Sequence, residues 1–119
     1  MNQTQKLYQK RIDYMHEILV YTNKKIRMDL YEILHNDDGS KNIIHFRIDL
    51  TRTKDIPTRC INDIVEKIIN DKSDLIIVAH LSRRMTGNIY VDFTIYRDYY
   101  DVPWYKRWFS SRRKIWRKL

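Results

Sequence analysis

Apolar residues recur in the first third of the chain at spacings of three, four and seven positions, the repeat of a helix with one apolar face. This pattern predicts a helix over residues 4–34, within an N-terminal helical segment of residues 1–36. The β-branched residues near Val20 weaken its middle, but the stripe stays in phase across them, which favours one long helix. The stripe consists of Tyr8, Ile12, Met15, Leu19, Ile26, Leu30 and Ile33.

The middle of the chain changes between strand and helix patterns. Residues 42–52 place apolar side chains at every second position, as a half-buried strand does. Residues 57–71 return to helical spacing behind Pro57, which suits a first helical turn. Two further apolar segments, residues 74–84 and 88–98, predict strands. We therefore expect the order strand, helix, strand, strand after the first helix.

The last two strands determine their own register. Their apolar residues can share one face only if a three-residue loop, residues 85–87, joins the strands, because a slip by one residue turns one set outward. Gly87 then occupies the left-handed position that such a loop requires. In this register His80 lies opposite Asp92.

These elements predict an α+β fold: a small three-stranded mixed sheet (β-α-β-β) with a long N-terminal helix and a basic amphipathic C-terminal helix. Residues 1–103 form a single domain with its core in residues 41–99, and residues 104–119 form the last helix. Either the strands lie in chain order, or the first lies beside the third, as in half of a split β-α-β fold. The long helix either covers the outer sheet face, over Ile76 and Val78, or projects and mediates assembly.

Composition excludes several classes of protein. A chain of 119 residues has room for one core, and its single cysteine excludes an internal disulfide or a cysteine-based zinc site. Its two glycines exclude a phosphate-binding P-loop and a dinucleotide fingerprint. No apolar run is long enough for a membrane span, and the N-terminus lacks a signal-peptide pattern. We expect an intracellular protein of a reducing compartment, the cytoplasm.

The positive charge is concentrated at the C-terminal end. The formal net charge is +8, yet residues 104–119 alone hold seven basic residues and no acidic one. On a helical wheel, the aromatic residues of this segment gather on one side, and all basic residues but Arg112 lie opposite. Such an asymmetry indicates contact with something anionic, and it says little about the fold.

The predicted anion-binding residues are therefore those of this segment, with two arginines beside the hairpin loop as a second, smaller basic spot near Arg52 and Lys54. They are Lys106, Arg107, Arg112, Arg113, Lys114, Arg117, Lys118, Arg83 and Arg84. The predicted anchors on the aromatic side are Trp104, Trp108, Phe109 and Trp116.

Nucleic acid is the favoured partner, because basic groups neutralise phosphates and exposed aromatic rings stack on unpaired bases. One alternative is a structural subunit of a larger assembly, such as a viral or phage particle, that uses the aromatic side and the N-terminal helix for protein contacts. Another is a peripheral protein of the membrane surface. A homo-oligomer also stays open, and so does simple packing of the tryptophans on the body.

Catalytic chemistry has one candidate, the pair His80 and Asp92, because a carboxylate can orient a histidine that acts as a general base. No serine or cysteine is placed to serve as its nucleophile. If the first and third strands are neighbours, His45 could join the pair around a metal ion. A solvated sheet face with cross-strand ion pairs explains the same residues more simply. We therefore expect a protein that is not an enzyme, with no metal and no cofactor.

Overall fold

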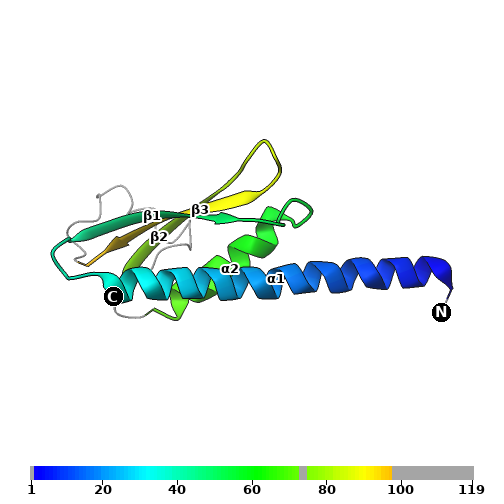
Figure 1. Ribbon diagram of the computed structural model, residues 1–119, viewed down its shortest axis with the longest axis horizontal. Helices are drawn as coiled ribbons and strands as arrows, with labels where there is room; N and C mark the ends of the chain where they lie inside the picture. Colours follow the sequence, from blue (N-terminus) through cyan, green and yellow to red (C-terminus); the bar gives the residue numbers. More distant parts are fainter. Residues whose placement is uncertain (1, 73–74, 98–119) are drawn as a thin grey trace.

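The computed structural model describes residues 2–72 and 75–97. Two helices and three strands follow in the predicted order (Figure 1), and each begins and ends within two residues of its predicted limits. They are α1 (Gln3–Asn36), β1 (Ile43–Leu50), α2 (Thr58–Asn70), β2 (Ile76–Arg83) and β3 (Ile89–Tyr96). The predicted helix of residues 104–119 lies outside the described residues. The α+β class is confirmed.

The sheet has the strand order β1-β3-β2, so the first strand lies beside the third. Both pairs, β1 with β3 and β2 with β3, are antiparallel. The prediction of a mixed sheet is therefore wrong, because β3 separates the two strands that run in the same direction. This order suits β3, whose four inward residues are fully buried and belong to the centre: Ile89, Val91, Phe93 and Ile95.

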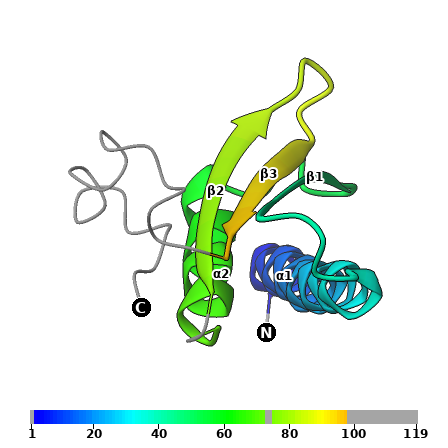
Figure 2. The same ribbon diagram turned by 90° about the vertical axis from the view of Figure 1, so that its left-hand side faces the viewer.

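Both helices cover the same face of the sheet, as Figure 2 shows. Ile26 and Leu30 of α1 share one core with Ile61 and Val65 of α2 and with Phe93 of β3. The alternative that α1 covers the outer face, over Ile76 and Val78, is wrong. The apolar stripe of α1 packs beside α2 instead, where both helices bury their stripes against the inward face.

The N-terminal half of α1 extends beyond the body (Figure 1). Its 34 residues span about 51 Å at about 1.5 Å per residue, close to the 58 Å length of the molecule. Burial begins only at Ile18, and the predicted stripe residues Tyr8 and Ile12 are 66% and 42% exposed. The alternative that α1 projects therefore holds for its first half. Asn2 and Gln5 cap this free end with reciprocal side-chain to backbone hydrogen bonds of 2.8 and 3.1 Å.

The β2–β3 hairpin has the predicted register and loop. His80 pairs with Asp92, and residues 85–87 connect the strands. Gly87 has φ +95°, the left-handed conformation that the loop requires. None of the described helices combines the length and the apolar character that crossing a membrane would demand.

Candidate anion-binding surface

The loop between β1 and α2 packs against the β2–β3 hairpin through a buried threonine. The Thr53 hydroxyl donates a hydrogen bond to the carbonyl of Leu50 at 3.1 Å and accepts one from the N–H of Ile89 at 2.8 Å. Thr53 is fully buried, so both bonds are shielded from water. A buried polar group that is satisfied from two strands holds the loop in one position.

Arg83, one of the predicted anion-binding residues, also joins the loop after β1 to the β2–β3 hairpin. Its guanidinium donates hydrogen bonds to acceptors in the loop, in the hairpin and at the start of α2. They are the carbonyls of Thr53 (3.3 Å), Lys54 (3.2 Å), Ile56 (2.6 Å) and Gly87, and the hydroxyl of Thr58 (3.1 Å). A guanidinium has five N–H groups, so these acceptors leave little donor capacity for a phosphate. The geometry favours a structural role for Arg83.

Arg84 and Lys54 present their charges beside this junction. Arg84 pairs with Asp49 at 2.8 Å, with 47% of its side chain exposed. A Cβ on Gly87 would lie 3.0 Å from Cγ of Lys54, so the stem of this lysine lies against the hairpin loop. Lys54 is exposed and forms no ion pair with a described residue. The predicted neighbourhood of Lys54 and the hairpin arginines therefore exists in the fold.

Arg52 connects this end of the sheet to α1. It occupies the left-handed region with φ 65° at the turn after β1. From there its guanidinium lies 3.8 Å from the carboxylate of Glu17 and 5.8 Å from the ring centroid of Tyr14. Nearly half of the Arg52 side chain, 48%, is exposed.

The projecting half of α1 carries more positive charge on the same side of the molecule. Lys6, Lys10 and Arg11 are exposed, and none pairs with an acidic side chain in the described parts of the chain. In Figure 1 this half of α1, the hairpin loop and the loop after β1 all extend toward one end. We call this end, with Lys54, Arg84 and the three α1 residues, the basic end.

His80 and Asp92 lie side by side, but the Asp92 carboxylate forms its ion pair with Arg47. The two residues are cross-strand partners, but Asp92 also lies opposite Arg47 on its other side. Arg47 donates to both Asp92 carboxylate oxygens, at 2.7 and 3.3 Å, and Asp92 raises the pKa of Arg47 still further. Since the guanidinium offers two donors in a fixed fork, it binds the carboxylate more strongly than one imidazole N–H does.

Other side chains near Asp92 on the outer sheet face also have partners. Tyr90 lies between two guanidiniums, with the Arg47 carbon 4.2 Å and the Arg84 carbon 5.4 Å from its ring centroid. His45 shares a 2.7 Å hydrogen bond with the hydroxyl of Thr94. Although β1 and β3 are neighbours, His45 does not join His80 and Asp92 at a metal site. The described residues contain no group of three or more side chains that could hold a metal ion.

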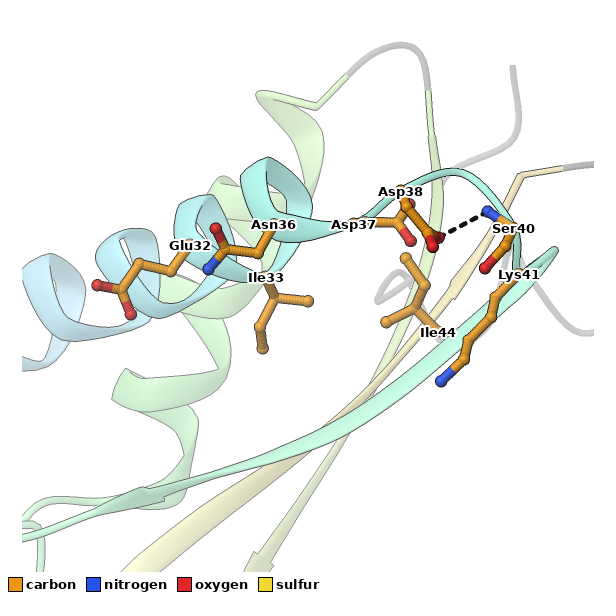
Figure 3. Close-up of a pocket in the computed structure, with 8 residues that line it drawn as sticks. All are labelled: Glu32, Ile33, Asn36, Asp37, Asp38, Ser40, Lys41 and Ile44. Atoms are coloured by element: carbon orange, nitrogen blue, oxygen red, sulfur yellow. Dashed lines mark hydrogen bonds between the residues drawn. The ribbon is translucent and has the colours of Figure 1, made fainter.

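A pocket at the opposite end of the sheet is lined mainly by acidic and polar side chains (Figure 3). It has a volume of about 450 Å³ between the end of α1, the following loop and Ile44. Glu32, Asp37 and Asp38 face it together with Lys41, and Asp37 also forms an ion pair with Arg97. Hydrogen bonds from Ser40 hold the pKa of Asp38 below its usual range, so its carboxylate stays charged. This charge, beside a helix C-terminus, is unfavourable for an anion.

The remaining predicted site residues lie outside the described residues. They are Lys106, Arg107, Arg112, Arg113, Lys114, Arg117 and Lys118, with the anchors Trp104, Trp108, Phe109 and Trp116. Sequence reasoning missed Thr53 and the structural use of Arg83. Both act through loop carbonyls or backbone N–H groups, which leave no periodic signal in the sequence.

Comparisons of the chain with protein-family models, with curated proteins and with solved structures each returned no match.

Proposed function

We propose that this protein is a non-enzymatic binding protein that docks to a polyanion, nucleic acid, through residues 104–119. The observation that carries the proposal is the charge of this segment, seven basic residues without an acidic one beside three tryptophans. Phosphates attract such a segment by release of their counterions, and unpaired bases stack on its indole rings.

The basic end of the body supports the same proposal. Arg84 of the basic end and Arg47 on the outer sheet face have carboxylate partners. Lys6, Lys10, Arg11 and Lys54 have none in the described parts of the chain, so they can neutralise phosphates without first breaking an ion pair. We propose that they extend the contact beyond residues 104–119.

The test is binding of labelled single-stranded and double-stranded nucleic acid by the full-length protein at two salt concentrations. With about five to seven phosphate contacts, affinity should fall by about 10³-fold or more between 50 and 200 mM salt. Affinity that does not change with salt would contradict the proposal.

A matched pair of variants locates the contact. Replacing Arg112, Arg113 and Lys114 by Gln removes three charges from the proposed segment and should reduce the slope of log affinity against log salt by about three. A control removes three charges elsewhere, from Lys24, Lys67 and Lys72. Both variants have the same net charge, so equal losses of affinity would indicate a general charge effect and not a site.

The surface of α1 favours assembly as a second candidate function. Four large side chains recur along α1 at intervals of seven: Leu7, Tyr14, Tyr21 and Met28 are 63%, 43%, 41% and 54% exposed. Large side chains repeated every seven residues on a helix form a stripe against which a partner helix can pack. Light scattering of the wild type and of a Leu7→Lys, Tyr14→Lys variant tests it. A wild type that stays monomeric at high concentration argues against self-assembly.

A further inference from the structure

The outer face of the sheet has an apolar end. At this end Tyr96 of β3 has Ile43 of β1 and Ile76 of β2 as its cross-strand neighbours, and Val78 is the next residue of β2 on the same face. Ile76 and Tyr96 form a small core of their own with Val78 packed against it, separate from the main core. We call these four residues the outer patch.

Two residues of the outer patch, Ile76 and Tyr96, are buried and Val78 is half-buried, although both helices lie on the other face; Ile43, on the opposite edge strand, is 44% exposed. Ile76 is 0% and Tyr96 is 4% exposed. Ile76 lies on an edge strand, where a side chain that no other segment covers stays open to water. Among the described elements, α1 and α2 cover only the inward face (Figure 2). A further segment must therefore cover the part of the outer patch formed by Ile76, Tyr96 and Val78.

We propose that the chain's own C-terminal segment is this cover and that its tryptophans, beginning with Trp104, pack on the outer patch. The chain leaves β3 at Tyr96, inside the patch, and all three tryptophans of the protein follow in residues 104–119. Trp104 lies eight positions after Tyr96, a reach of up to about 26 Å when extended. Val78 lies one strand away, at about 5 Å spacing, so the indole reaches it easily.

The size of the outer patch favours this occupant over a second copy of the chain. A stable interface between two proteins takes about 20–30 residues from each partner, and the patch has four. A segment of the same chain needs far less area, because its effective concentration is high. Docking of the aromatic side would leave the basic side turned outward. This inference goes beyond the proposed function, which concerns that basic side, and the two can fail separately.

Intrinsic fluorescence tests the inference directly, since every tryptophan belongs to the proposed segment. The wild type should show blue-shifted tryptophan emission and severalfold weaker quenching by acrylamide than an isolated peptide of residues 98–119. Val78→Lys places a charge in the outer patch and should shift the emission to the red and increase quenching toward that of the peptide. Ser82→Lys is the control, since Ser82 is also half-buried and lies on the same face of the same strand. It should leave both readouts unchanged.

Three results would overturn the inference. In the first, acrylamide quenches the wild-type tryptophans as easily as those of the peptide. In the second, the Val78→Lys variant is folded, as judged by circular dichroism, and its emission is unchanged. In the third, the emission of the wild type shifts with protein concentration. The last would indicate a second copy as the cover.

If Val78→Lys does not fold, nuclear Overhauser contacts between indole protons and the methyl groups of Ile43 or Val78 in the wild type decide. Their presence supports the inference, and their absence overturns it. Nucleic-acid affinity of the Val78→Lys variant is measured separately and tests only the proposed function.

Discussion

Arg83 and Arg84 are adjacent in the sequence and chemically identical, yet the fold uses them differently. Arg83 lies at the end of β2, where its guanidinium meets the carbonyls of two loops. Arg84 lies one residue further and turns to Asp49 on the outer face. Alternation along a strand sends neighbouring side chains to opposite faces, so Arg83 turns to the loop carbonyls and Arg84 turns to the outer face, although both side chains are exposed.

Arg83→Ala should therefore lower the free energy of unfolding by about 2 kcal/mol, because it leaves several carbonyls without their charged donor. Arg84→Ala should leave it nearly unchanged, since an exposed ion pair contributes little. Urea denaturation of both variants measures the difference. Equal stability of the two would contradict the structural role of Arg83, and a loss of nucleic-acid affinity only in Arg84→Ala would support its place in the basic end.

Thr22 is a second residue whose contribution to stability depends on its surroundings in the fold. It is fully buried in α1, and its hydroxyl finds no hydrogen-bond partner among the described residues. Thr22→Val keeps the shape and removes the unsatisfied hydroxyl, so it should raise the free energy of unfolding by about 1 kcal/mol. Chemical denaturation checks this. Destabilisation would mean that the hydroxyl does have a partner, such as a buried water.

At the scale of elements, the hairpin and the loop after β1 behave as one unit. Thr53 and Arg83 bond across them, and Lys54 lies against Gly87. The sequence predicted the hairpin loop from register alone, because strand alternation is a local property. It also placed Lys54 near the hairpin arginines, but it did not predict the hydrogen bonds of Thr53 with Arg83 and Ile89, since these join residues 30 or more positions apart.

Substitution of the two glycines distinguishes backbone strain from steric contact between the loops. Gly87 and Gly39 both have positive φ, +95° and +79°, but only Gly87 has a neighbour, Cγ of Lys54, within 4 Å of a built Cβ. Gly39→Ala should cost about 1 kcal/mol from backbone strain alone. Gly87→Ala should cost more, because the lysine stem must also move. Thermal denaturation compares the stability of the two variants. Equal losses of stability would show that Lys54 does not pack tightly against Gly87.

At the scale of the whole molecule, α1 has two unequal halves. Residues 18–34 share the core with α2 and the sheet, whereas residues 3–14 are exposed on every side. Isolated helices of about 12 residues are marginal in water, so the projecting half depends on the packed half for its stability.

Hydrogen exchange should show this division. Amide protons of residues 5–14 should exchange far faster than those of residues 20–34, and protection should fall steadily toward Asn2. Addition of nucleic acid should slow exchange in the projecting half if Lys6, Lys10 and Arg11 join the contact. Uniform protection along α1 in the free protein would indicate that a second molecule already covers it.

The sequence by itself determined the elements, the hairpin register, Gly87 and the concentration of positive charge in residues 104–119, because periodicity, turn conformation and charge are carried by neighbouring residues. Only the tertiary structure decided the position of β3 at the centre and of both helices on one face. It also decided that the Asp92 carboxylate forms an ion pair with Arg47, although His80 is its other cross-strand neighbour, and that Arg83 holds two loops. These outcomes depend on competition between distant partners, and local patterns do not record which partner packs or bonds best.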